Sequence, residues 1–337
     1  MIRLHFTEED LGRARFALSP MWETIASLRT LTSPDTALQL HRPWRDWTRG
    51  RLGEVDLGLL TTLVRPAGYL PDFLVPSPTR RASSFEAALR QVTAAEPAAV
   101  TWQLRHLAAH PVAAPGPGRA QRTRLLHELA DRPDAGLARV ARALESYWRA
   151  AIEPHWSRLQ ALLRADVAYR LEQLADEGLH VLLGHLHPSV SYLDSTLRIT
   201  KYYDGDADLS GRGLLLVPCA FAWPDVFVLT AEPNTPTVSY SPRGVGTLWH
   251  RPGTTDRSAL AEVLGRTRAA LLSQLDLPMS TTQLADALAL SAPTLSVHLQ
   301  ALARAGILIA RREGRAVLYA RTRLGNDLLA GAPQGQR

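Results

Sequence analysis

Two histidines and an aspartate form the first group of side chains whose types and spacing could do chemistry. His185 and His187 are separated by a single residue, and Asp194 follows nearby. Alternate residues of a β-strand share one face, so this spacing could bring two imidazoles and a carboxylate to a metal ion. Paired histidines on a sheet are more often structural or exposed, however, and we expect neither a bound metal nor a cofactor.

Motifs of nucleophilic and phosphate-transfer catalysis are missing from the sequence. It has no Gly-x-Ser-x-Gly run and no phosphate loop, and Gly211 and Gly213 precede a predicted strand, the wrong order for a dinucleotide fingerprint. The single cysteine, Cys219, lies in an apolar run and is predicted to be an inert buried thiol. We therefore expect no enzyme activity. The alternative is an enzyme domain over residues 1–250, using the histidines and aspartate named above, fused to a regulatory module.

A second group of side chains points to nucleic acid. A helix predicted over residues 291–304 would bury leucines 295, 299 and 302 on one side. The other side and its flanks then present groups able to meet phosphates or base edges of duplex DNA: Pro293, Thr294, Ser296, Val297, Gln300 and Arg304. His298 lies nearer the buried side, which favours packing or phosphate bonding over base readout. Ordinary solvated helix surface is the alternative interpretation.

Positive charge is concentrated in the same part of the chain. Between Asp256 and Gly325 there are nine arginines and five acidic residues, a net charge of +4, while the whole chain carries +6. Arg311, Arg312 and Arg315 directly follow the predicted helix. Such a module suits a polyanion, because neutralising phosphates releases counterions. A merely solvated surface would explain the charge alone equally well.

The elements that must position these residues can be predicted from their caps. Ser280 and Gln283 form a capping box for a helix ending at Leu288, and Ser291 caps the next helix, with Pro293 in its first turn. Gly306 ends that helix. Alternation over residues 307–312 and 315–319 predicts a hairpin tipped by arginines. Helix, turn, helix and basic hairpin together predict a winged helix-turn-helix over residues 256–330, whose second helix fits a major groove about 12 Å wide.

Residues 258–325 resemble the ArsR/SmtB family of bacterial repressors. The likeness is carried by Gln283-Leu-Ala-Asp-Ala-Leu, Leu290-Ser-Ala-Pro-Thr-Leu-Ser-Val-His-Leu-Gln-Ala-Leu, Ala305-Gly-Ile-Leu and Arg311-Arg-Glu-Gly-Arg-Ala-Val-Leu-Tyr. The N-terminal part, from Ile2-Arg-Leu-His-Phe through Arg15-Phe-Ala-Leu-Ser-Pro-Met-Trp-Glu, resembles the extra domain of large actinobacterial regulators of this type.

The resemblance implies a repressor that binds double-stranded DNA as a homodimer on a palindromic operator until a small-molecule effector releases it. The sequence departs from the metal-sensing members of the family. No cysteine precedes the helix-turn-helix in this region, and the tail from Thr322 to Arg337 has no histidine. A metal switch of either familiar kind is therefore not predicted. A third interpretation makes the winged helix a protein-interaction module, against which its basic hairpin argues.

An α+β fold is predicted for the chain, with an N-terminal domain over residues 1–250 that handles sensing, dimerisation or both. Its first 178 residues show mainly helical periodicity after a strand at Ile2, Leu4 and Phe6, with Ser83 and Glu86 as a capping box. Residues 179–250 predict a small antiparallel sheet. The expected strands are 180–186, 197–203, 213–221, 226–230 and 237–240.

Six tryptophans of the N-terminal region are predicted to lie in the core, where some could line an apolar effector pocket: Trp22, Trp44, Trp47, Trp102, Trp148 and Trp156. The N-terminus lacks the basic and apolar segments of a secretion signal, and no apolar run approaches the ~20 residues that span a bilayer. We expect a soluble, cytoplasmic protein that does not bind membranes.

Overall fold

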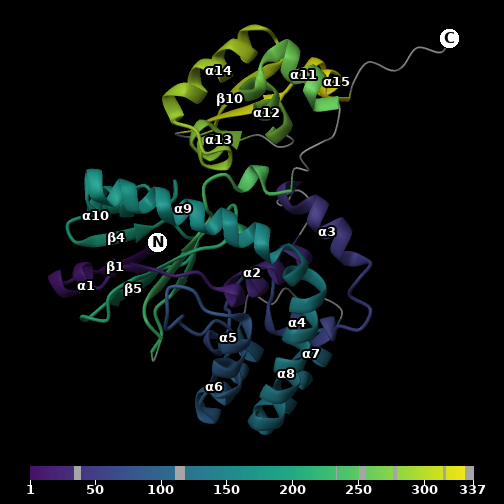
Figure 1. The fold of residues 1–337 in the computed structure, drawn as a ribbon. Coiled ribbons are helices and arrows are strands. Elements are labelled where there is room, and N and C mark those ends of the chain that lie inside the picture. Colours follow the sequence, from purple (N-terminus) through teal and green to yellow (C-terminus); the bar gives the residue numbers. More distant parts are fainter. Residues whose placement is uncertain are drawn as a thin grey trace. The chain divides into compact units, whose positions relative to one another are not determined.

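The computed structural model describes residues 1–33, 39–110, 118–232, 234–249, 256–275, 279–313 and 316–330. The chain divides into two compact units (Figure 1). The first comprises Met1–Pro34 and Trp44–Ser241, and the second comprises Asp35–Pro43 and Pro242–Arg337. Each unit is described by itself below.

Two four-stranded sheets form the strand layer of the first unit. One has the order β3-β4-β1-β5 and the other the order β2-β6-β8-β7. The strands are β1 (Ile2–His5), β2 (Arg15–Phe16), β3 (Val190–Leu193), β4 (Thr196–Ile199), β5 (Gly205–Asp208), β6 (Leu215–Pro218), β7 (Phe227–Leu229) and β8 (Thr237–Tyr240). β1 pairs antiparallel with β4 and parallel with β5. β6 is parallel to both β2 and β8, and β7 is antiparallel to β8.

The predicted α+β class is confirmed, but the prediction of an antiparallel sheet is wrong in detail. Both sheets are mixed: β1 and β2 from the start of the chain pair in parallel with strands 200 or more positions later, and β6 is also parallel to β8. The strand expected over 180–186 is instead part of helix α10 (Leu179–Gly184). A short continuous apolar run has no period that separates strand from helix. Here Gly178, at φ +82°, ends the preceding helix and starts this one.

One hydrophobic core joins the two sheets. Leu4 and Leu197 from the first sheet and Leu216 and Tyr240 from the second belong to a single buried cluster. Leu182 of α10 belongs to the same cluster. Burial of apolar surface on this scale is the main force that holds the sheets and α10 together.

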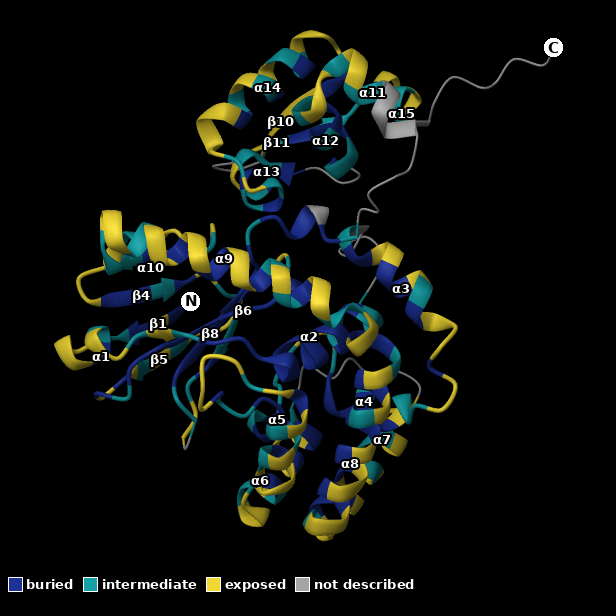
Figure 2. Cartoon of the chain, viewed as in Figure 1, coloured by how far each residue is buried: buried dark blue, intermediate teal, exposed yellow. Residues whose placement is uncertain are grey.

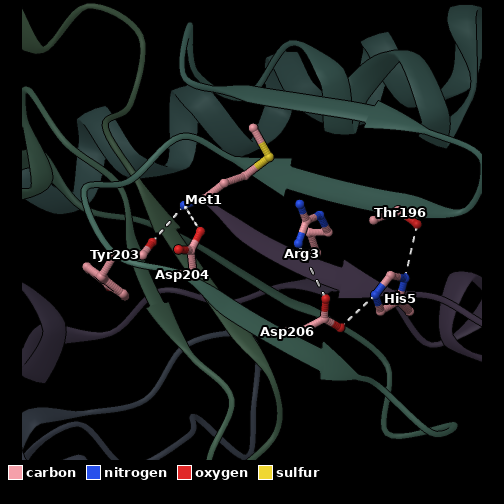
Figure 3. A network of polar contacts seen from close by, with 7 residues as sticks. All are labelled: Met1, Arg3, His5, Thr196, Tyr203, Asp204 and Asp206. Carbon is pink, nitrogen blue, oxygen red and sulfur yellow. Dashed lines mark hydrogen bonds and ion pairs between the residues drawn. The ribbon is translucent and has the colours of Figure 1, made fainter.

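A polar network fixes β1 between its neighbours (Figure 3). The His5 ring lies 3.1 Å from Thr196 Oγ1 on β4 through Nδ1 and 2.8 Å from Asp206 Oδ1 on β5 through Nε2. The Met1 amino group donates to the carbonyl oxygen of Tyr203 at 2.7 Å and to Asp204 Oδ1 at 3.0 Å. The segment before β5 is thereby attached to the beginning of β1.

Helices make up most of the rest of the first unit, and the first two residues of one of them, Arg42 and Pro43, belong to the second unit. They are α1 (Glu8–Gly12), α2 (Pro20–Thr32), α3 (Arg42–Arg49), α4 (Leu57–Leu63), α5 (Phe85–Thr93), α6 (Pro97–Ala109), α7 (Arg119–Asp131), α8 (Pro133–Tyr147), α9 (Trp156–Glu177) and α10. Ser19 caps α2, since its Oγ accepts from Trp22 N–H at 3.2 Å. The cap of α5 is Ser84 rather than Ser83: Ala87 N–H donates to Ser84 Oγ at 3.2 Å. Helix α2 is buried along most of its length (Figure 2).

The tryptophans do not all lie in the core. Trp22, Trp44 and Trp148 are buried, whereas Trp47 and Trp156 are half-buried. Trp102 is 61% exposed, so its placement in the core was wrong. Its indole stacks on the His106 ring one turn later, with centroids 5.0 Å apart. A surface helix can hold an aromatic side chain in this way without burying it.

The second unit contains five helices and a three-stranded sheet of order β10-β11-β9 among its described residues. Its elements are α11 (Asp256–Leu264), α12 (Arg266–Gln274), β9 (Met279–Ser280), α13 (Thr281–Leu288), α14 (Ala292–Arg304), β10 (Leu308–Glu313), β11 (Ala316–Arg321) and α15 (Arg323–Ala330). Leu272, Leu284, Leu299 and Tyr319 are buried and contribute one side chain each from α12, α13, α14 and β11.

Candidate nucleic-acid interface

Helix α13 begins at the predicted capping box. Gln283 N–H donates to Ser280 Oγ at 3.2 Å, and Ser280 N–H donates to Gln283 Oε1 at 2.8 Å. The helix ends at Ala289, which adopts the left-handed conformation at φ +55°. This reversal brings the chain directly to Ser291, the cap of the next helix. A tight turn between two helices is thus built from local hydrogen bonds.

Helix α14 is oriented by its leucines. Ser291 Oγ accepts from Thr294 N–H at 3.3 Å and lies 2.7 Å from Thr294 Oγ1. Leu295, Leu299 and Leu302 are buried. Because these positions share one side of the helix, the opposite side must face outward.

The outward face of α14 carries the residues that the sequence singled out. Pro293, Thr294, Val297, Gln300 and Arg304 are exposed, with Val297 65% exposed at the centre. Ser296 is half-buried, and its Oγ accepts from Gln300 Nε2 at 3.4 Å. This stripe combines apolar side chains, hydroxyl and amide groups, and a cation. Those groups can contact thymine methyls, base edges and phosphates, respectively.

His298 occupies a different environment from this stripe. The residue is half-buried, and its buried Nδ1 has no hydrogen-bond partner. An imidazole at the margin of a helix can turn one nitrogen outward while its ring packs inward. A packing or phosphate-bonding role for His298 stays a prediction.

The hairpin after α14 presents a cationic edge. Arg311 and Arg312 of β10 are exposed and lie opposite Leu318 and Val317 of β11. Arg315 lies outside the described residues. Arg321 has another role, since its Nη1 donates to the carbonyl oxygen of Leu272 at 3.0 Å and ties β11 to α12. Two arginines of the described hairpin are therefore available for a polyanion.

The segment that contains Gly244 and Gly246 contacts α13, and no pattern in the sequence indicated this contact. Gly244 N–H donates to the carbonyl oxygen of Asp286 at 2.5 Å, and Gln274 Nε2 donates to that of Gly246. Gly246 is closely packed, because an added Cβ would lie 2.7 Å from Gln274 Oε1 and 3.0 Å from Ala287 Cβ. Trp249 Nε1 donates to His41 Nδ1 at 2.9 Å. No local pattern indicates contacts between residues over 200 positions apart.

His185 and His187 each have hydrogen-bond partners within the protein. His185 follows α10, and Gln173 Nε2 lies 3.3 Å from its Nδ1. His187 is bonded through Nδ1 to Ser189 Oγ at 2.7 Å and through Nε2 to the carbonyl oxygen of Pro224 at 3.1 Å. Burial lowers the pKa of the His187 imidazole. Asp194 lies in the β3–β4 turn, near Arg198. No metal-binding group of three His, Cys, Asp or Glu side chains is found in the described part of the chain.

Helices α13 and α14 followed by the β10–β11 hairpin define a winged helix-turn-helix, a module of DNA-binding transcription regulators. Comparison with known families agrees. Residues 258–310 match the family described as a helix-turn-helix domain. Residues 81–245 match a family of unknown function, DUF5937. No curated protein and no solved structure matches the chain. Within the described ranges, no helix combines the length and apolar character needed to cross a membrane.

Proposed function

We propose that this chain is a sequence-specific transcription repressor of the ArsR/SmtB type. It acts in the cytoplasm as a homodimer on a palindromic operator, is released by a small-molecule effector, and has no catalytic activity. The observation that carries the proposal is the exposed face of α14, which lies in the same unit as a hairpin bearing exposed Arg311 and Arg312.

The division of chemistry between these two elements supports the DNA-binding part. A helix fits the major groove, where Gln300 can bond to a base edge and Val297 can touch a thymine methyl group. Arginines on a neighbouring hairpin can neutralise phosphates, which gives affinity without sequence preference. Recognition of the DNA sequence is thus assigned to residues of α14, and sequence-independent affinity is assigned to the hairpin arginines.

Exposed apolar side chains on the first and last helices of the module support the homodimer. Val263 of α11 is 81% exposed and Leu324 of α15 is 49% exposed, and these two helices contact each other. A second copy packed on this face would bury both side chains and place two α14 helices about a two-fold axis. Symmetric recognition helices read half-sites about one helical turn apart.

The test of DNA binding uses the hairpin arginines. Arg311→Ala combined with Arg312→Ala should weaken binding to every duplex and lower the slope of log K against log salt by about 2, because each phosphate contact contributes roughly 0.9. The matched control is Arg124→Ala with Arg142→Ala, which removes two exposed charges from α7 and α8. Gel shifts with DNA from upstream of the protein's own gene measure both. Equal slopes in the two double variants would contradict the proposal.

A further inference from the structure

A cavity of about 450 Å³ lies within the first unit, and all of its lining residues belong to that unit. Its wall is formed by α2, by the loop after α4, by the segment before β5 and by β7. Cavities of several hundred Å³ with a mostly apolar lining and a few polar groups are the usual form of small-molecule sites. The segment before β5 is the one that the Met1 amino group holds (Figure 3).

Aromatic rings and a guanidinium group make up one wall. The rings of Trp22 and Phe227 are stacked, with centroids 6.0 Å apart and an interplanar angle of 27°. Arg29 Cζ lies 5.2 Å from the centroid of the same Phe227 ring. Trp22 and Arg29 are seven positions apart on α2 and therefore share one face of that helix. Phe227 contacts both side chains, so two aromatic rings and a cation lie together in this wall.

Two hydrogen-bond donors of this wall are buried without a partner. They are Trp22 Nε1 and Arg29 Nε, and the Trp22 residue is 2% exposed. Arg29 does use Nη2, which donates to the carbonyl oxygen of Gly68 at 2.9 Å. A buried donor without an acceptor costs roughly 1–3 kcal/mol, so native structures rarely keep two at one site without a use for them.

The charge of Arg29 has no counterion of its own in the described part of the chain. Burial lowers the pKa of the guanidinium, and Asp225 opposes that effect. Asp225, however, already forms an ion pair with Lys201, the only lysine in the sequence. Arg29, Lys201 and Asp225 together leave one positive charge at this end of the cavity, and Asp72, the other carboxyl group of the lining, is not among the groups that act on Arg29. An entering monoanion would neutralise it.

We propose that this cavity binds a small, planar, largely apolar carboxylate, whose ring lies along Phe227 and Trp22 and whose carboxylate accepts from Arg29 Nε and Trp22 Nε1. The carboxylate supplies the two missing acceptors and the missing negative charge together. A neutral molecule of the same shape supplies a hydrogen-bond acceptor but no negative charge. Binding of such a ligand is independent of the DNA-binding module, but its role as the effector rests on the proposed repressor function.

The experiment titrates the full-length protein with 2-naphthoate in a calorimeter. 2-Acetylnaphthalene is the matched neutral probe, because a methyl group replaces one carboxylate oxygen. We expect one naphthoate per chain and at least tenfold weaker binding of the ketone, as hydrogen bonds to a charged group contribute about 1.5–3 kcal/mol. Equal affinity for the two probes, tighter binding of the ketone, or no binding of naphthoate at millimolar concentration would overturn the proposal.

Two variants test whether naphthoate binds at the wall formed by Trp22, Arg29 and Phe227. Arg29→Met should weaken naphthoate binding at least tenfold, and Trp22→Phe should weaken it severalfold while keeping an aromatic ring. Arg105→Met, which removes an exposed arginine from α6, is the control and should bind as the unmodified protein does. Thermal melts without ligand establish that each variant folds. If Arg29→Met does not fold, the naphthoate affinity of Trp22→Phe is the test. An unchanged affinity in that variant overturns the proposal.

A separate readout addresses the effector role. Naphthoate is added to the complex of the protein with its promoter DNA, and release of DNA is measured by gel shift. Release that is lost in Trp22→Phe supports both the ligand site and the repressor mechanism. Binding of naphthoate without release keeps the site and refutes its role as the effector site. Failure of DNA binding itself leaves the calorimetric result unaffected.

Discussion

At the scale of single residues, Gln300 on the outward face of α14 is suited to bidentate recognition of adenine. Gln300 is exposed, and its amide can donate and accept at the same time, which matches the edge of adenine in the major groove. In the free protein its Nε2 donates only to Ser296 Oγ at 3.4 Å, a long hydrogen bond. Little is therefore lost when the amide turns to a base.

Replacement of Gln300 tests this assignment. Gln300→Ala should reduce the preference for the promoter duplex over a scrambled duplex by about tenfold, because a good bidentate contact discriminates by ~1–3 kcal/mol. Competition gel shifts with the two duplexes measure the ratio, and Thr294→Ala should also alter it. The Arg311→Ala and Arg312→Ala double variant is the contrast and should weaken both duplexes alike. If the α14 variants and the hairpin variant all lost affinity for both duplexes equally, the proposed division between sequence recognition and phosphate binding would be contradicted.

Glu23 shows at the same scale how the core of the first unit uses a carboxyl group. It is fully buried on α2 and accepts from Ala220 N–H at 2.7 Å and from Phe221 N–H and Cys219 Sγ at 3.3 Å. Burial raises the pKa of Glu23 to about 7, against the hydrogen bonds that lower it. Burial and the neighbouring Glu23 also raise the pKa of the Cys219 thiol, which fits the predicted inert thiol.

The pH dependence of stability should reveal Glu23. Between pH 4.5 and about 7 the unfolded chain loses a proton that the folded protein keeps, so the free energy of unfolding falls as the pH rises through this window. The effect is on the order of 3 kcal/mol at most. Glu23→Gln should remove this part of the slope. Denaturant unfolding of both proteins at pH 4.5 and pH 7.5 measures it, and identical slopes would show that Glu23 does not titrate there.

At the scale of elements, a buried cluster of polar side chains connects helix α9 to β8. Tyr240 Oη donates to Asp166 Oδ2 at 2.7 Å, and Arg170 Nε lies 3.9 Å from Asp166 Oδ1. Arg170 Nη1 also donates to the carbonyl oxygen of His185 at 2.9 Å, just after α10. One buried ion pair thus holds α9, α10 and a strand together, and removal of either charge would leave the other uncompensated.

Asp166→Asn should therefore destabilise the first unit by about 3 kcal/mol, because Arg170 would remain buried without a full counter-charge. Asp131→Asn is the control, since it breaks an exposed pair with Arg105 and should cost less than about 1 kcal/mol. Urea unfolding followed by circular dichroism compares the two. Similar losses in both variants would mean that the buried pair contributes no more than a surface pair.

At the scale of the whole molecule, the proposed repressor depends on two copies of the chain. The apolar side chains of Val263 and Leu324 are exposed within the second unit, although α11 and α15 pack against each other. Burial of such side chains on a symmetric partner is a common basis of homodimers. The operator would then show the same two-fold symmetry.

Charges placed on this face should dissociate the dimer. Val263→Glu with Leu324→Glu should give a monomer by light scattering and reduce binding to a palindromic site more than to a half-site. Leu193→Glu is the control, because Leu193 is a similarly exposed apolar residue on β3 of the first unit. A double variant that stays dimeric would place the interface elsewhere.

Much of the winged helix-turn-helix was predictable from the sequence, because its elements are set by local chemistry. Ser280, Gln283 and Ser291 cap helices through residues three positions away, and leucines 295, 299 and 302 determine which side of α14 is buried. Interactions over such short separations follow directly from residue order. Interactions of the same short range place Ser19 at the start of α2 and Gly178 at the end of α9.

Only the tertiary structure decided the features that join distant parts of the chain. The parallel pairing of β1 with β5, the contact of His41 with Trp249, and the placing of Phe227 between Trp22 and Arg29 have no local signal. The apolar run before His185 could have formed a strand or a helix, and packing against the core favoured the helix. Local hydrogen bonds determine where elements begin and end, whereas burial of apolar surface across the whole unit determines which elements meet.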